Sequence, residues 1–81
     1  MKTLEQMPNV TLKQAAKYLE QKKPFKASNF FAVRDLQGNY IVYSFATIMA
    51  VVFADGRENY LDNSYYSRTT SRHQSIIKQA L

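Results

Sequence analysis

The residues best suited to chemistry lie together in the last third of the chain. Residues 63–74 are rich in Ser, Thr, Tyr and Asn, and they include Arg68, Arg72 and His73, the one histidine of the sequence. A hydroxyl next to a histidine can act as an activated nucleophile, and an imidazole can move protons near neutral pH. No carboxylate stands near His73 in the sequence, and the chain has no cysteine. The pattern therefore gives catalysis little support, and we expect a protein that is not an enzyme.

A structural role explains His73 at least as well. It precedes Ile76 and Ile77 by three and four residues, so the three side chains share one face of a helix. We expect a partly buried ring that is bonded to a neighbouring hydroxyl such as Thr69 or Thr70. The remaining enzymatic alternative is a toxin-like ribonuclease that works with a lone histidine, or with Arg, Lys and Tyr.

The same segment is suited to holding an anion. The first turn of a helix presents free N–H groups and the positive end of the helix dipole. The alternative is that the hydroxyl groups only cap the helix and hold the loop, and both roles can coexist. The predicted nucleic-acid- or anion-binding residues are Arg68, Thr69, Thr70, Ser71, Arg72 and Lys78.

The charge distribution favours a negatively charged partner. Eleven Lys and Arg against six Asp and Glu give a net charge of +5, and no acid follows Asp62. Basic charge at both ends of the chain suits a polyanion or an acidic protein surface, although it also serves solubility. Exposed tyrosines stack on bases or anchor protein interfaces. The predicted partner-binding residues are Tyr65, Tyr66, Lys22, Lys23 and Lys26.

Other classes of site are not indicated. Metal binding needs clustered His, Cys or carboxylate ligands, and a phosphate-binding loop needs more glycine than Gly38 and Gly56. No apolar stretch approaches the roughly 20 residues of a membrane-spanning helix, and the N-terminus lacks the layout of a signal peptide. We expect a cytoplasmic protein without a cofactor, built as a single domain over residues 1–81, with residues 1–8 as a flexible lead-in.

Two helices are predicted to flank the rest of the chain. Thr11 and Gln14 form a capping box ahead of an apolar stripe, which predicts a first helix from residue 12 to 21 or 22. Ser71 and Gln74 form a second capping box. The helix that follows is short, and it must dock on the rest of the fold to persist.

Strand patterns fill the middle of the sequence. Aromatic and β-branched runs predict short strands, Gly38 supplies a turn, and Asp55-Gly56 is the signature of a two-residue type I′ hairpin. The predicted fold class is α+β: an N-terminal helix, an antiparallel meander of three or four strands, and a C-terminal helix, with both helices on one face of the sheet. The predicted strands are residues 30–34, 40–45, 48–54 and 57–61.

Two stretches resemble small proteins of phages and prophages. They are Tyr-Ile-Val-Tyr-Ser-Phe at 40–45 and Tyr-Tyr-Ser-Arg-Thr-Thr-Ser-Arg-His-Gln at 65–74. In those proteins a strand rich in Tyr and Val precedes Tyr-Ser-x-Thr-Thr-Ser-Arg/Lys-His at the start of a closing helix. The resemblance covers roughly residues 29–81. It implies a phage origin, and small phage proteins often act on host machinery, including as anti-CRISPR inhibitors of defence nucleases.

Two further resemblances concern nucleic-acid binding. Residues 11–19 resemble the first helix of excisionase-type helix-turn-helix domains, although no second helix follows. The order helix, three strands, helix resembles double-stranded RNA-binding domains, which use basic residues at the start of their second helix. Arg68 and Arg72 fall near that place, but the lysine-rich signature is absent.

These observations lead to one functional prediction and two alternatives. The leading prediction is a small phage-type binding protein that inhibits or modulates a host protein or nucleoprotein, such as a CRISPR effector. The first alternative is direct binding of DNA or RNA through the basic residues, and the second is the toxin-like ribonuclease.

Overall fold

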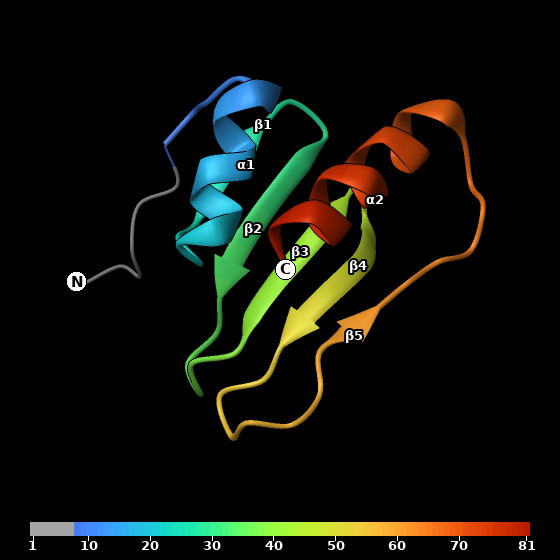
Figure 1. Cartoon of the computed structure of the whole chain (residues 1–81). Helices are drawn as coiled ribbons and strands as arrows, with labels where there is room; N and C mark the ends of the chain where they lie inside the picture. Colours follow the sequence, from blue (N-terminus) through green and yellow to red (C-terminus); the bar gives the residue numbers. More distant parts are fainter. Residues whose placement is uncertain (1–7) are drawn as a thin grey trace.

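In the computed structural model, which describes residues 8–81, two helices pack side by side on one face of a five-stranded sheet (Figure 1). The strand order is β1-β2-β3-β4-β5, and each neighbouring pair is antiparallel. The predicted α+β class and the placement of both helices are confirmed; of the predicted lead-in, residues 1–7 lie outside the described residues. The elements are α1 (Leu12–Glu20), β1 (Phe25–Ala27), β2 (Phe30–Arg34), β3 (Tyr40–Ser44), β4 (Thr47–Val52), β5 (Tyr60–Leu61) and α2 (Arg68–Ala80).

The start of α1 follows the predicted capping box. Thr11 Oγ1 accepts a hydrogen bond from the backbone N–H of Gln14 at 3.1 Å, and Gln14 Oε1 accepts one from the backbone N–H of Thr11 at 3.0 Å. The helix buries Ala15 and Leu19. The two residues of the capping box are three positions apart, so the start of the helix can be predicted from the sequence alone.

The start of α2 was predicted wrongly. Ser67 is the N-cap, because its Oγ accepts a hydrogen bond from the N–H of Thr70 at 3.2 Å. Ser71 lies inside the helix, and Gln74 makes no capping bond. The Ser and Thr residues around Arg68 offer several equivalent caps, so the choice depends on which residues must face the sheet. The helix is consequently one turn longer at its N-terminus than expected.

β1 is a strand that the sequence pattern did not predict. Only three residues long, it is too short to show alternation. Its outer edge is paired by the chain that precedes α1: the N–H of Lys26 donates to the carbonyl of Pro8, and the N–H of Val10 donates to the carbonyl of Lys26, both at 2.9 Å. This pairing protects the edge of the sheet.

The predicted two-residue hairpin at Asp55-Gly56 is also wrong. β4 ends at Val52, and residues 53–59 form a longer loop before the short β5. The loop folds back on itself, since the Asp55 carboxylate accepts hydrogen bonds from the backbone N–H and the Nε of Arg57. The Arg57 guanidinium lies 4.3 Å from the centre of the Phe53 ring. Gly38 does have the expected positive φ, at 91°.

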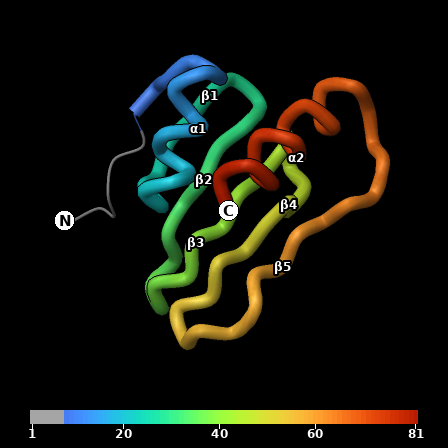
Figure 2. Tube along the Cα trace, in the orientation of Figure 1, coloured from blue at the N-terminus to red at the C-terminus, as the bar shows by residue number. Residues whose placement is uncertain are grey.

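The core lies between the sheet and the helices. Alternate residues of the central strands point toward the helices, and a bulge between Val42 and Tyr43 lets the adjacent Met49 and Ala50 both be buried. Figure 2 shows the two helices over the sheet, with the C-terminal end of α2 near the centre of the molecule. Among the described residues, no helix is long and apolar enough to cross a membrane. The core residues are Ala15, Leu19, Phe25, Ala27, Phe30, Ala32, Tyr40, Val42, Met49, Ala50 and Ile77.

Candidate nucleic-acid interface

The hydroxyl-rich segment divides into two sides when it coils into α2. The side toward the sheet carries Thr70, His73, Gln74 and Ile77, all buried. The side toward solvent carries the basic residues. Of the predicted anion-binding residues, Thr70 therefore belongs to the packing of the fold, and Ser71 is half-buried between the two sides. The exposed residues are Arg68, Thr69, Arg72, Ser75, Lys78 and Gln79.

His73 is built into the core. Its ring is 4% exposed and stacks on Phe30, with centroids 4.4 Å apart and planes inclined by 8°. Ser44 Oγ lies 2.7 Å from His73 Nδ1 and 3.2 Å from Thr70 Oγ1. Burial, with a smaller contribution from the charge of Arg72, lowers the pKa of His73. The hydrogen-bond partner is thus a strand serine rather than a hydroxyl of the same segment, and a ring so enclosed is poorly placed for general base catalysis.

Gln74 fastens the loop that precedes α2. Its Nε2 donates hydrogen bonds to the carbonyls of Asp62 and Ser64, at 2.7 and 2.9 Å. The Asp62 carboxylate accepts hydrogen bonds from the N–H of Ser64 and from the hydroxyl of Tyr66, at 2.8 and 2.6 Å. The Tyr66 hydrogen bond is the main cause that lowers the pKa of Asp62. No strand forms at Tyr65-Tyr66, so the segment is an ordered loop.

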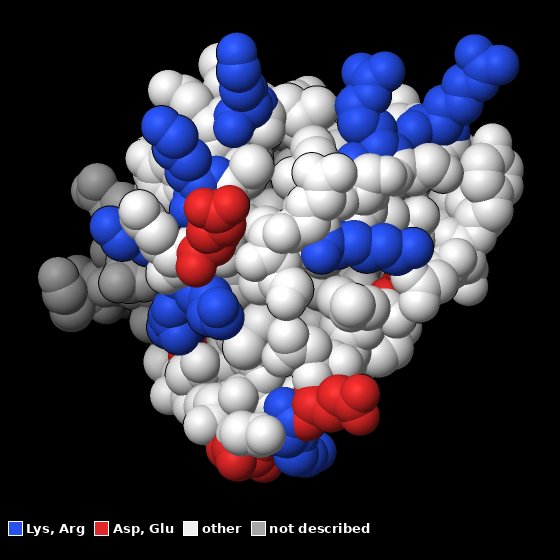
Figure 3. All heavy atoms as spheres, in the orientation of Figure 1, with Lys and Arg blue, Asp and Glu red and all other residues white. Residues whose placement is uncertain are grey.

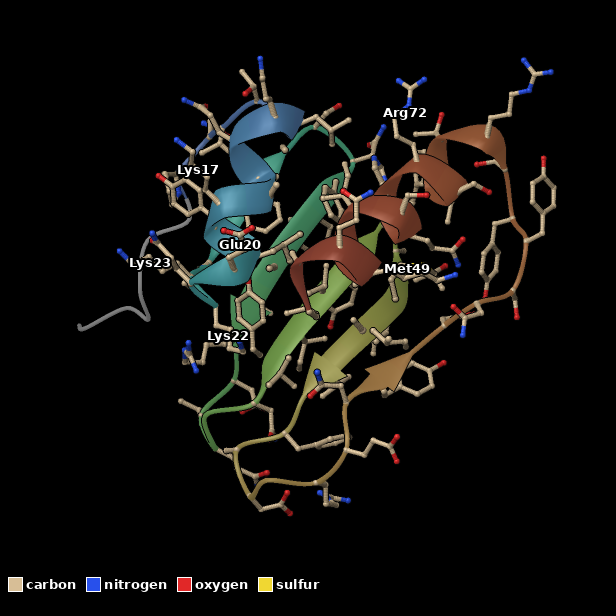
Figure 4. All side chains as sticks on the ribbon, in the orientation of Figure 1. Lys17, Glu20, Lys22, Lys23, Met49 and Arg72 are labelled. Carbon is tan, nitrogen blue, oxygen red and sulfur yellow. The ribbon has the colours of Figure 1, made fainter. Side chains whose placement is uncertain are left out.

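The outer surface of the two helices is strongly basic. In Figure 3, blue side chains spread over the helices, and little red lies among them. Figure 4 identifies Glu20 between Lys17 and Lys22 on the α1 side, and Arg72 pointing outward from α2. We call this surface the helix layer; its basic residues are Lys13, Lys17, Lys22, Lys23, Arg68, Arg72 and Lys78, and its acid is Glu20.

The other described acids lie in loops, and three of them, Asp35, Asp55 and Asp62, are engaged there. The Asp35 carboxylate accepts hydrogen bonds from the side-chain and backbone N–H groups of Asn39, and the side-chain bond is the largest of the effects that lower the pKa of Asp35. Asp55 pairs with Arg57, with Nε and Oδ2 2.8 Å apart. Between residues 8 and 81, no salt bridge neutralises a basic residue of the helix layer. Among the described residues, the positive charge of this surface is therefore offset only in part, by Glu20.

A shallow hollow lies beside α2. It is lined by Tyr65, Arg68, Ser71, Arg72 and Ser75, and Tyr65 is 75% exposed. The hollow brings Tyr65, a predicted partner-binding residue, together with three predicted anion-binding residues, Arg68, Ser71 and Arg72. The three lie on neighbouring turns of α2, and Tyr65 lies in the loop just before the helix. Across the described chain, no group of three His, Asp or Glu residues is arranged to hold a metal ion.

The predicted partner-binding lysines do not form one site. Lys22 and Lys23 follow α1 and belong to the helix layer. Lys26 is the middle residue of β1, in register with Phe31 of β2, and both point away from the helices. The predicted contact surface is therefore split between the two faces of the sheet.

The face of the sheet opposite the helices is apolar, a feature that was not predicted from the sequence. Strand register places its side chains in two rows across the sheet. Phe31 and Tyr43 stack there, with centroids 4.8 Å apart, and within the described chain no element packs on this face. Successive side chains of a strand point to opposite faces, and these strands carry apolar residues at consecutive positions, so both faces of the sheet are apolar. The two rows are Lys26, Phe31, Tyr43 and Ile48, and Val33, Ile41, Val51 and Tyr60.

Residues 9–80 match the sequence model of a family of unknown function, DUF8033. The chain belongs to the DUF8033 family. The match runs from the residue that pairs with β1 to the last residue of α2, so the DUF8033 unit includes α1 and the whole sheet. No match was found among curated proteins or among solved structures.

Proposed function

We propose that this DUF8033 protein binds nucleic acid through the helix layer. The observation that carries the proposal is the charge of that surface, where, among residues 8–81, seven Lys and Arg side chains stand against one acid, Glu20. A surface with this excess of positive charge attracts a polyanion over a distance of several ångströms and releases its condensed counterions on binding.

Two helices supply the contacts in different ways. Arg68 and Arg72 lie one turn apart on α2, and a guanidinium can bind phosphate oxygens with two parallel hydrogen bonds. The lysines of α1 act as point charges on flexible stems. Contacts of this kind fix the position of the phosphate backbone but do not read its sequence. We therefore expect binding with little sequence preference.

A pair of charge-matched variants tests this proposal. Arg72→Ala removes one positive charge from the helix layer, and Arg57→Ala removes one from the distant β4–β5 loop, where Arg57 already pairs with Asp55. We expect Arg72→Ala to weaken binding to DNA and RNA oligonucleotides in fluorescence anisotropy, and Arg57→Ala to leave the Kd nearly unchanged. Equal effects of the two substitutions would show that binding depends on the net charge of the chain and not on the helix layer. No binding by the wild-type chain would reject the proposal.

A second candidate function is supported by the open apolar face of the sheet. Exposed aromatic and branched residues such as Phe31, Tyr43 and Ile48 are typical of protein interfaces. This face fits the predicted action on a host protein or nucleoprotein, for which the resemblance to phage proteins is the further support. Binding through it should change little with salt, whereas binding through the helix layer should weaken steeply.

The anti-CRISPR role, the phage origin and the cytoplasmic location remain predictions from that resemblance and from the sequence. The ribonuclease alternative has weak support, since the one histidine is enclosed and hydrogen-bonded. RNA that stays intact during the binding assays supports binding without catalysis. Cleavage that is lost in a folded His73→Ala variant would revive the enzymatic alternative.

A further inference from the structure

The turn between β3 and β4 holds an aromatic residue where glycine is preferred. Ser44 pairs with Thr47, so Phe45 and Ala46 form a two-residue turn. Phe45 has φ = 58°, and Ala46 is not among the residues with positive φ. In hairpins, a positive φ at the first turn position alone is the pattern of type II′ turns, which favour glycine there. A bulky side chain in this conformation is an outlier that costs free energy.

The ring of Phe45 is also poorly buried. The residue is 47% exposed, so the fold gains only part of the benefit of burying an aromatic side chain. The neighbouring turn between β1 and β2 makes a useful comparison, because Ser28 occupies the same position with φ = 57°. Ser28 is exposed and polar. Phe45 thus combines a strained backbone with an exposed apolar ring, and packing explains only part of that combination.

Phe45 lies at the end of the sheet where α2 begins. Its ring centroid is 6.5 Å from that of His73, the residue that follows Arg72. The backbone N–H of Phe45 donates to the carbonyl of Asn29 at 2.6 Å, which joins the β1–β2 and β3–β4 turns. The ring is therefore presented by a braced turn, beside the second turn of α2, whose exposed side carries Arg72.

We propose that Phe45 stacks on an unpaired base of nucleic acid bound to the helix layer. This inference rests on the proposed function and specifies its ligand as a strand with unstacked bases. Every base has a face on which an aromatic ring can stack, and Arg68 and Arg72 supply positive charge for the phosphates of the same strand. A fully paired duplex has its base faces covered except at its ends. Phe45 thus adds a contact that charge alone does not provide.

The experiment compares two RNA hairpins of equal length, one fully paired and one with a single unpaired adenosine. We expect the wild-type chain to bind the bulged hairpin more tightly. Phe45→Ala should lose this preference, by a factor of roughly 5 to 150, which is the range that alanine substitution of a base-stacking aromatic covers. Phe45→Trp should keep the preference, because the stacking surface remains. The salt dependence should be the same for all three proteins, since no charge is removed.

Two variants separate stacking from packing. Phe45→Leu keeps apolar bulk against His73 but has no aromatic face, so it should fold and still lose the preference. Ser28→Gly changes the matched residue of the neighbouring turn and should leave binding unchanged. Equal binding of the bulged hairpin by wild type and Phe45→Leu, or no preference in the wild type, would overturn the inference and leave the helix layer in place. Absence of binding to both hairpins would reject the proposed function and this inference together.

Discussion

Ser44 Oγ lies 2.7 Å from His73 Nδ1, across a sequence separation of 29 residues. The serine ends β3, and the histidine lies in the second turn of α2, so the bond joins the end of the central strand to the helix that covers it. Thr70 Oγ1 contacts the same Ser44 oxygen at 3.2 Å. The hydroxyl-rich segment therefore has a packing role on one side of α2, which leaves the other side free to carry charge.

Loss of the histidine should destabilise the fold. We expect His73→Ala to lower the free energy of unfolding by about 2–4 kcal/mol, because it removes a buried ring that stacks on Phe30 and leaves Ser44 with one partner fewer. Urea denaturation measures the change. Ser75→Ala, on the exposed side of the same helix, is the control and should stay within about 0.5 kcal/mol of wild type. Equal stability of the two variants would contradict the structural role of His73.

Stability should fall as the solution becomes mildly acidic. The pKa of His73 is lowered in the folded chain by burial and by Arg72, so between the folded and unfolded pKa values the unfolded chain binds more protons. By linkage, the contribution is complete above pH about 6.5 and is lost as the pH falls below it. Melting temperatures between pH 8 and pH 5 test this.

A His73→Gln variant provides the control for the pH experiment. It removes the titrating group, and its melting temperature should change less over the same range. The aspartates with lowered pKa values, Asp35, Asp55 and Asp62, titrate below their usual 3.8, which lies outside this window. A wild-type melting temperature that is constant from pH 8 to pH 5 would contradict the lowered pKa.

Gln74 should control the order of the loop before α2. Gln74→Ala removes the donor to the carbonyls of Asp62 and Ser64, and we expect a loss of about 1–3 kcal/mol in the free energy of unfolding. Amide hydrogen exchange should rise in residues 62–67 more than in the strands. Gln79→Ala, at an exposed position of the same helix, is the control. Unchanged exchange in the loop would show that Gln74 is not its anchor.

The sequence predicts best where its signals are local. The capping box of Thr11 and Gln14 fixes the start of α1, and the strand at residues 30–34 matches β2, because both patterns depend on residues within a few positions. Ser67 was not predicted as the cap of α2, because the neighbouring Ser and Thr residues are equally able to cap a helix. The contacts of Thr70 and His73 with Ser44 decide which of them face the sheet. Those contacts are long-range, so no local pattern reveals them.

The candidate site was predicted in part. Arg68, Arg72 and Lys78 do lie on the exposed side of α2, and Lys22 and Lys23 join them on the helix layer. Thr70 does not, since it faces the sheet. The positive φ of Phe45 had no signal in the sequence, because it follows from the strand register that makes residues 45 and 46 a two-residue turn.

The salt dependence of nucleic-acid binding tests the central claim most directly. The measurement is the slope of log Kd against log salt concentration for wild type, for the double variant Arg68→Ala/Arg72→Ala, and for Arg57→Ala as a remote control. We expect binding by the wild type that weakens with salt, a slope smaller by about 1 for each helix-layer arginine removed, and a control slope equal to wild type. No binding at low salt, or a slope that the double variant leaves unchanged, would contradict the claim that the helix layer binds phosphates.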